Sequence, residues 1–444
     1  MGTIRKMAAT CVLAIAACLS ISGGSFAQPA TTSAADVLET WYRLTLELVR
    51  HTPTYSPPVA SRSLAYLGVT AFEVVASGDG ELQSLGGQLN EFEQPVQREP
   101  GAAYDEAVAL ESAMSHAIRT LFANTGPTGQ RAMAAVGKKL SSEVSRGLSQ
   151  EVVARSEAYG RTVAEHVLAW SAGDGGAVVE NMGFPLAYVL KEGPAHWVPT
   201  SLVSQQQTPL LPDWGRNRPL VMPDGASCPL PPPPEYSEEK DSRFYEEALE
   251  VYETVNGLSE EQQAIARFWS DDPMLSPTPP GHWMSIATQI LDREDAGLAR
   301  RVDVLARLGL ALSDSFIACW HAKYEFDLVR PVTYIRRVID PRWVPILNTP
   351  PFPEYPSGHS TQSAAAAEVL ADLFGDPFEF VDATHESDGL PARRYRSFRH
   401  AADEAGISRL YGGIHFRAAI ERGLEQGRCV AAFVNGLRTR ETKG

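Results

Sequence analysis

The second half of the sequence carries three basic side chains, two histidines and a Ser-Gly pair that could together bind a tetrahedral oxyanion. In chain order they are Lys323 and Arg330, then Ser357-Gly358-His359, then Arg409 and His415. Ammonium and guanidinium groups form strong charge-assisted hydrogen bonds with oxyanions, and the first amides of a helix add further donors. An imidazole beside such a site can transfer protons. These residue types could therefore form a site for a phosphate-like anion.

Each group also has a simpler interpretation when taken alone. Lys323 and Arg330 could lie on a solvated helix face, Ser357 could be an ordinary N-cap, and His415 could be structural. The ordered set is more specific: Lys, six residues, Arg-Pro; then Pro-Ser-Gly-His; then Ser-Arg, five residues, His. With this set the chain resembles the vanadium-dependent haloperoxidases and the related type-2 phosphatidic acid phosphatases, most densely from about residue 268 to 430.

The resemblance implies a role for every member of the set. It implies three cations that bind the anion, two neutral donors, a general acid and base, and a residue that is the axial ligand of vanadate or the nucleophile of a phosphatase. In that order these are Lys323, Arg330 and Arg409; Ser357 and the Gly358 amide; His359; and His415. Vanadate and phosphate are both tetrahedral oxyanions, so the same residues can serve a peroxidase or a phosphatase.

Three flanking residues favour the peroxidase. Trp320 resembles a tryptophan on the halide side of fungal chloroperoxidases, Phe352 stands where those enzymes carry phenylalanine, and Asp272 resembles the aspartate that pairs with the arginine of the Ser-Arg motif. The resemblance thus implies a haloperoxidase with vanadate as cofactor and hydrogen peroxide and halide as substrates. Iodide or bromide is expected rather than chloride, oxidised to hypohalous acid through a His-bound peroxovanadate that Lys323 polarises.

Two alternatives stay open on the sequence. A soluble, exported acid phosphatase of the same superfamily would act on a phosphate monoester through a phosphohistidine at His415. A non-catalytic oxyanion-binding protein would need the cations but not the proton-transferring His359. The sequence ranks these second and third.

Local sequence predicts how these residues are presented. Lys323 and Arg330 are seven residues apart, so on one helix they would share a face with Trp320, and Pro331 would end that helix at Arg330. Ser357 and Gly358 are expected to open a helix, whose free amides would face the anion. Gly412 and Gly413 are expected to end one helix so that another can begin near His415.

The whole chain reads as all-α. It has 444 residues, 44% of them hydrophobic, and a net charge of -15, which argues against nucleic acid as a partner and requires any anion site to be a local basic cluster. We expect two four-helix-bundle-like halves, residues 28–175 and 239–444, joined by a proline-rich connection over 176–238. Apolar periodicity predicts helices over 37–51, 60–76, 104–122, 130–148, 151–172, 241–256, 260–269, 282–292 and 296–322.

The first 27 residues are expected to be a signal peptide with cleavage before Gln28, so the protein would be periplasmic or secreted. Lipoprotein anchoring at Cys18 is a minor alternative, and no later stretch predicts a transmembrane segment. The mature cysteines, Cys228, Cys319 and Cys429, allow at most one disulfide, whose pairing the sequence does not give. The histidines His282, His321, His385 and His400 lack compact ligand spacing and are expected to be structural or exposed.

Overall fold

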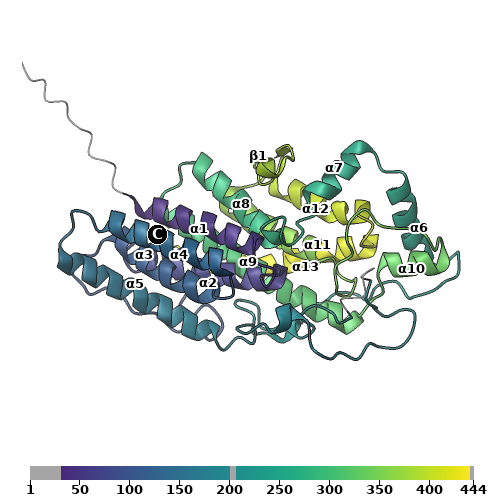
Figure 1. Ribbon diagram of the computed structural model, residues 1–444, viewed down its shortest axis with the longest axis horizontal. Helices are drawn as coiled ribbons and strands as arrows, with labels where there is room; N and C mark the ends of the chain where they lie inside the picture. Colours follow the sequence, from purple (N-terminus) through teal and green to yellow (C-terminus); the bar gives the residue numbers. More distant parts are fainter. Residues whose placement is uncertain (1–31, 201–206, 441–444) are drawn as a thin grey trace, which may run out of the picture. The chain divides into compact units, whose positions relative to one another are not determined.

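The computed structural model describes residues 32–200 and 207–440, and helices dominate that part of the chain (Figure 1). The first five are α1 (Ala34–Arg50), α2 (Pro57–Ala76), α3 (Glu106–Leu121), α4 (Pro127–Val144) and α5 (Gln150–Ser171). Eight more follow: α6 (Arg243–Asn256), α7 (Glu260–Phe268), α8 (Thr278–Arg293), α9 (Leu298–Phe326), α10 (Pro331–Val338), α11 (Gly358–Phe374), α12 (Phe398–Tyr411) and α13 (Arg417–Asn435). The all-α class is confirmed. The predicted signal peptide and Cys18 lie outside the described residues.

The helices start where the sequence supplies caps. Ser33 and Ser259 each form a reciprocal capping box with the residue three positions on, and a proline occupies the first turn of α2, α4, α8 and α10. Both features satisfy or remove amides that have no partner in the first turn. A short antiparallel pair, β1 (Phe380–Asp382) and β2 (Arg393–Tyr395), interrupts the helical pattern between α11 and α12.

The longest helix, α9, connects the two halves of the fold. It packs along α2 on one side and against α11 and α13 on another. At the crossing with α2, a Cβ added to Gly309 would lie 2.9 Å from the Ala65 Cα, and one added to Gly68 would lie 2.9 Å from the Ala306 Cα. Glycine therefore lets the two backbones approach this closely.

By length and composition, α2 is the one helix of the described chain that could cross a membrane, but its apolar window is wholly buried in the core. The described residues, 32–200 and 207–440, group as one compact unit, and α9 contributes to its core. The boundaries near residues 175 and 238 stay predictions.

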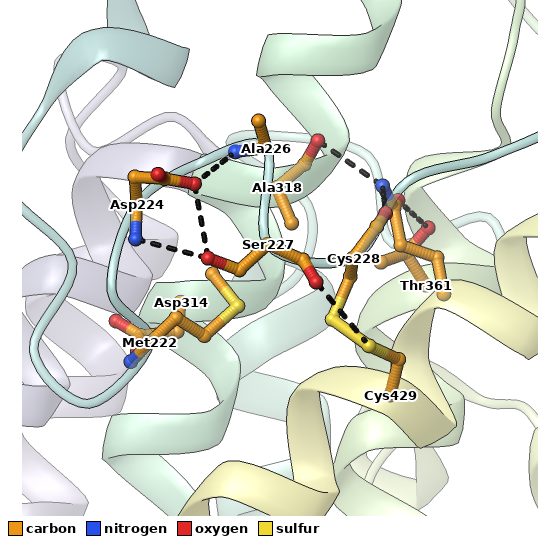
Figure 2. The surroundings of a disulfide bond; sticks show 10 residues. Met222, Asp224, Ala226, Ser227, Cys228, Asp314, Ala318, Thr361 and Cys429 are labelled. Atoms are coloured by element: carbon orange, nitrogen blue, oxygen red, sulfur yellow. Dashed lines mark hydrogen bonds between the residues drawn. A yellow bond between two sulfur atoms is a disulfide. The ribbon is translucent and has the colours of Figure 1, made fainter.

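The proline-rich connection contains no α-helix in its described residues, only the short 3-10 turns η1 (Asn181–Gly183) and η2 (Trp214–Arg216). Two of its contacts are with buried or covalently bonded partners on α9 and α13. The buried Asp314 of α9 accepts hydrogen bonds from three successive amides, those of Leu220, Val221 and Met222, at 2.7–2.9 Å. A disulfide joins Cys228 to Cys429 of α13, and Figure 2 shows the loop that carries Cys228 against that helix.

The disulfide closes a loop of 201 residues, and the third mature cysteine, Cys319, is buried and unpaired. Close to the bridge, the Gln426 amide on α13 donates to the carbonyls of Cys228 and Ala318 and accepts from the Thr361 hydroxyl. This one buried side chain therefore links the connection to α9, α11 and α13. The expectation of at most one bridge is met, and its pairing is now assigned.

Candidate functional site

The predicted site residues lie on three segments, and each segment is next to the start or the end of a helix. Lys323 is in the last turn of α9, which ends at Phe326 because Asp327 adopts a left-handed conformation (φ 51°, ψ 40°). Arg330 lies outside that helix, directly before α10. The expectation that one helix carries both cations on one face is therefore wrong: the left-handed Asp327 ends it before Pro331 can do so.

The other two segments match the sequence expectations. Ser357 is the N-cap of α11, and its hydroxyl accepts a hydrogen bond from the Ser360 amide. Gly412 and Gly413 separate α12, which carries Arg409 in its last turn, from α13, which begins two residues after His415. Gly413 has φ 76°, a conformation that glycine adopts without strain.

Lys323 is fully buried and holds the segment before α11 in place. Its Nζ donates to the carbonyls of Pro353 at 2.9 Å, Glu354 at 3.0 Å and Pro356 at close range. An ammonium has three donors, so all of them are engaged with the backbone. Burial lowers the pKa of Lys323 to about 7.

Arg330 and Arg409 are buried, and both keep donor atoms without partners. Arg330 donates from Nε to the Phe352 carbonyl at 2.9 Å and from Nη1 to the Ile414 carbonyl at 2.9 Å, while its Nη2 has no partner. Arg409 donates from Nη1 to the Trp269 carbonyl, while its Nε has no partner. Burial lowers the pKa of each guanidinium to about 10. A buried cation with an unused donor has a strong reason to bind an anion.

Glu354 fixes the tautomer of His415. Its Oε1 lies 2.8 Å from the His415 Nδ1 and also accepts the Phe416 amide at 2.8 Å. Because Oε1 must accept from that amide, His415 Nδ1 is the donor and Nε2 carries the lone pair, which faces the Arg330 Nη1 at 3.1 Å. Burial, followed by the charge of Arg330, lowers the pKa of His415 well below 6.5. The imidazole is thus neutral, with a lone pair on Nε2 that could bind a ligand.

Glu354 was not among the predicted site residues, although it lies just before the Pro-Ser-Gly-His motif. The residue is completely buried, and burial raises its pKa to about 8 although Arg330 and Lys323 act in the opposite direction. The only available signal was a carboxylate between two prolines of an otherwise apolar turn.

His359 and its carboxylate partner correct a second expectation. The His359 Nε2 lies 3.5 Å from the Asp271 Oδ2, and Asp271 is completely buried. Asp272, which was expected to pair with Arg409, makes no ion pair within 4 Å in the described part of the chain and acts on Arg409 only through space. The buried member of the Asp-Asp pair is thus the first, and it faces His359. Burial, followed by the charge of Arg409, lowers the pKa of His359 to about 4.

A cavity of about 480 Å³ opens onto these residues. Trp320, Phe352, Gly358, His359, Arg409 and His415 line it, among other mostly apolar side chains. The Trp320 and Phe352 rings lie 4.8 Å apart, and the Phe352 ring lies 5.0 Å from the Arg330 guanidinium carbon and 5.1 Å from the Lys323 Nζ. Lys323, Arg330 and Ser357 lie behind this lining. Another cavity of about 460 Å³, lined within 175–186 and 211–217, contains none of the predicted residues.

Two histidines that were expected to be unremarkable prove to be close to the site. His282 and His385 are buried, and each has a ring nitrogen facing the Asp271 Oδ1, at 2.9 Å and 3.3 Å. Sequence spacing could not show this, because the three residues come from three separate segments. His321 and His400 are neither fully buried nor part of this group.

The arrangement fits a bound oxyanion such as vanadate or phosphate. Buried atoms without partners, the Arg330 Nη2, the Arg409 Nε and the His359 Nε2, occur around the neutral His415. A Cβ added to Gly358 would meet its first neighbour, Trp320, only at 3.8 Å, so the packing leaves space at this position. Three cations, Lys323, Arg330 and Arg409, lie here with one carboxylate, Glu354, which is hydrogen-bonded to His415. A tetrahedral anion would satisfy these donors and balance the charge.

Comparison with known proteins agrees with this site. The family described as the VCPO second helical-bundle domain matches residues 303–341 and 338–444. The vanadium chloroperoxidase of Curvularia inaequalis is 28% identical over 172 residues, and the match covers 31% of this chain and 28% of that protein, less than a third of the relative.

Two solved structures are similar over most of the chain. A crystal structure described as the first bacterial vanadium-dependent iodoperoxidase has a TM-score of 0.86 and 38% identity, and covers 94% of this chain and 100% of that one. A holo-type bacterial vanadium-dependent chloroperoxidase has a TM-score of 0.68 and 18% identity, over 87% of this chain and 93% of that one. The second similarity is one of fold.

Proposed function

Because this chain belongs to the vanadium-dependent haloperoxidase family, we propose that it oxidises iodide or bromide with hydrogen peroxide to hypohalous acid. The family's cofactor is vanadate. The observation that carries the proposal is a neutral, Glu354-oriented His415 beside guanidinium atoms that lack partners. The choice of iodide or bromide draws on the 38% identical neighbour, which is described as an iodoperoxidase.

We assign the anion-binding roles from geometry. The Arg330 Nη2 and the Arg409 Nε donate to the oxyanion, the α11 amides at Gly358 add neutral donors, and His415 binds it through Nε2. Ser357 caps α11 and lies directly before the Gly358 amide on the same side of the anion. When bound, vanadate supplies a Lewis-acid centre that activates peroxide without a change of oxidation state.

Lys323 acts in two ways in this proposal. Its three backbone bonds fix the segment that carries Glu354 and leads to Ser357, and its charge adds to the field at the anion. Since no donor is spare, direct contact with a substrate oxygen requires one of those carbonyl bonds to open.

His359 handles protons, and the two aromatic residues shape the halide side. His359 lines the cavity and has a buried Nε2 without a hydrogen-bond partner, so it can hold or release one proton there. Phe352 and Trp320 exclude water from the wall next to the cations, which strengthens the electrostatic interactions there.

We also propose that the protein is exported. The disulfide between Cys228 and Cys429 supports this, because such bonds persist in oxidising compartments and are rare in the cytosol. Edman or mass analysis of the mature N-terminus would test cleavage before Gln28.

The deciding experiment uses the purified mature protein with orthovanadate. Peroxide-dependent oxidation of iodide, bromide and chloride is measured beside hydrolysis of an aryl phosphate, with His415→Ala as the control for the site. We expect iodide and bromide oxidation that depends on vanadate. Phosphate hydrolysis that vanadate inhibits, with no halide oxidation, would reject the proposal in favour of the phosphatase.

A further inference from the structure

A buried group of carboxylates and histidines lies on one side of His359, and its outer end reaches the surface. We call it the Asp271 cluster: Asp271, His282, His385, Asp382 and Asp388. The Asp271 Oδ1 faces the His282 Nδ1 at 2.9 Å and the His385 Nε2 at 3.3 Å. The second nitrogen of each histidine faces another carboxylate: His282 Nε2 lies 2.8 Å from Asp382, and His385 Nδ1 lies 3.1 Å from Asp388.

Charge balance indicates that protons hold this cluster together. Each histidine faces a carboxylate with both ring nitrogens, so each of these contacts needs one proton between nitrogen and oxygen. With both imidazoles doubly protonated, two imidazoliums and Arg50, which pairs with Asp388, would balance the three carboxylates. Burial alone would lower the pKa of His282, but Asp271 and Asp382 raise it to about 10.

One divalent cation in place of two protons would give the same charge, but the distances favour protons. Two ligand atoms that are each 2.0–2.1 Å from a tetrahedral ion lie about 3.3 Å apart. The 2.9 Å between the Asp271 Oδ1 and the His282 Nδ1 is instead the length of a hydrogen bond. The 3.3 Å contact to His385 would allow either arrangement.

The two arms of the cluster differ in where they lead. The His282 arm ends at Asp382, and both side chains are completely buried. Along the His385 arm the exposed fraction of the side chain rises from 0% at Asp271 to 5% at His385 and 21% at Asp388. Only the second arm therefore connects Asp271 with solvent.

The inner end of that arm faces an atom that solvent does not reach. The His359 Nε2 is buried without a hydrogen-bond partner, and its nearest carboxylate oxygen is the Asp271 Oδ2 at 3.5 Å. The reaction proposed above, halide plus H₂O₂ plus H⁺ giving hypohalous acid plus water, consumes one proton in each turnover. A buried proton carrier has to be recharged each time.

We propose, on the basis of the proposed function, that Asp388 and His385 form a proton entry path that recharges His359 through Asp271. The His385 imidazolium gives its Nε2 proton to the Asp271 Oδ1, and the Asp271 carboxyl turns so that this proton reaches the His359 Nε2. The His385 ring then turns so that its bare nitrogen faces Asp388 and takes up a proton that the Asp388 carboxylate receives from solvent. Each group gains one proton and loses one, and only N–H and O–H bonds form and break. His385 and Asp388 are positioning and proton-carrying residues that do not touch the substrate.

The charged surroundings fit this direction of transfer. The titratable or charged groups that face Asp271 and His385 are His282, His359, Asp388 and Arg409, with Asp272, Asp382 and Arg50 beyond them. Burial would raise the pKa of Asp271, but His282, His359 and His385 together outweigh it and hold the pKa of the carboxyl well below 3.8. Asp271 is thus a brief carrier that passes its proton on.

The test compares His385→Gln with His282→Gln. Both variants remove an imidazole from the Asp271 Oδ1, but only His385 leads to solvent. In dilute buffer at saturating vanadate and peroxide, we expect His385→Gln to lower kcat for iodide about tenfold, with the KM for iodide unchanged. Addition of about 50 mM imidazole should restore most of the lost kcat, because a small diffusible proton donor can replace the missing histidine. Loss in His282→Gln should not respond to imidazole.

A second variant tests the same path in case His385→Gln does not fold. Asp388 is part-exposed and has no contact with the cavity, so Asp388→Asn should fold and should show the same buffer-rescued loss. Unchanged kcat in dilute buffer, or a loss that imidazole rescues equally in His282→Gln, would overturn the path. So would a stoichiometric divalent cation found by elemental analysis of the purified wild type.

A readout without turnover separates this inference from the proposed function. In vanadate-free protein with ¹⁵N-labelled histidine, exchange of the His359 ring proton with water should slow about tenfold in His385→Gln and not in His282→Gln. Ten histidines keep the spectrum tractable. Equal exchange rates in the wild type and His385→Gln would reject the path even if halide oxidation is observed. If no halide is oxidised, the exchange rates still decide it.

Discussion

Two buried clusters of charge differ in how completely their charges are paired. In the first half of the fold, Arg62 donates from Nε to Asp174 at 2.6 Å and from Nη2 to the Ser171 carbonyl, while the Tyr66 hydroxyl and the Gly176 amide complete the Asp174 carboxylate. In the second half, Arg330 and Arg409 are equally buried, yet each keeps an atom without a partner and neither forms an ion pair in the described chain.

The difference separates a structural charge from one kept for a ligand. Breaking a buried pair is costly because it leaves an uncompensated ion. Arg330 and Arg409 already bear that cost in the vanadate-free protein, so they should weaken the fold until an anion binds. Asp271 lies between these cases, because three imidazoles surround it and one of them belongs to the site.

The largest expected effect comes from replacing His415, the proposed protein ligand of the anion, which lies beside the unpaired guanidinium atoms. His415→Ala should abolish measurable halide oxidation, a loss of at least about 10³-fold, since removal of a central catalytic residue can cost about 10⁶-fold. Calorimetric titration with orthovanadate should show no binding. Retention of wild-type affinity would mean that the cations alone hold the anion, contrary to the role given to Nε2.

Matched arginine variants test the comparison directly. Arg62→Met should lower the free energy of unfolding by about 3 kcal/mol, because it strands Asp174. Arg409→Met should cost at most about 1 kcal/mol without vanadate, the value of its one carbonyl bond, while eliminating tight vanadate binding. Urea unfolding of both variants, with and without vanadate, measures this. Equal destabilisation would show that Arg409 is structural.

His359→Ala separates anion binding from proton transfer. We expect turnover to fall about 100-fold while the Kd for vanadate changes much less, because general acid–base catalysis contributes about 10²–10⁴-fold. Steady-state kinetics and vanadate titration on one preparation provide the two values. Parallel losses in both would count against the assigned role.

The remaining prediction concerns the pH dependence of stability. Burial lowers the pKa of Lys323 from 10.5 to about 7, so the unfolded chain binds the extra proton between these values. The stability contribution of Lys323 is present above about pH 10.5 and is lost as pH falls towards 7, at about 1.4 kcal/mol for each pH unit. Lys323→Met should remove this slope. Denaturant unfolding of vanadate-free protein at pH 7.5 and 9 gives the difference between the two slopes.

The ordered motif predicted the cations and histidines: Arg330 and His359 adjoin a proline or glycine at a helix start, and Arg409 and His415 flank the Gly412-Gly413 break. Arg330 was placed on the wrong element, since a left-handed Asp327 leaves no clear signature in sequence. The expected pair of Asp272 with Arg409 does not form in the described chain; the buried neighbour Asp271 instead faces His359, a difference that burial decides and composition does not show. Glu354 and the Asp271 cluster were missed because their partners are brought together only by tertiary packing.

The close crossing of α2 and α9 has a consequence far from its own location. Gly309 and Lys323 lie on one continuous helix, fourteen residues or about 21 Å apart. A side chain at position 309 or 68 would push against backbone, so the relief would come from sliding or tilting α9 as a rigid rod. That movement would shift the ammonium group relative to the segment that it anchors. In directed evolution, substitutions at these two glycines would therefore change the geometry of the site without changing any residue that lines it.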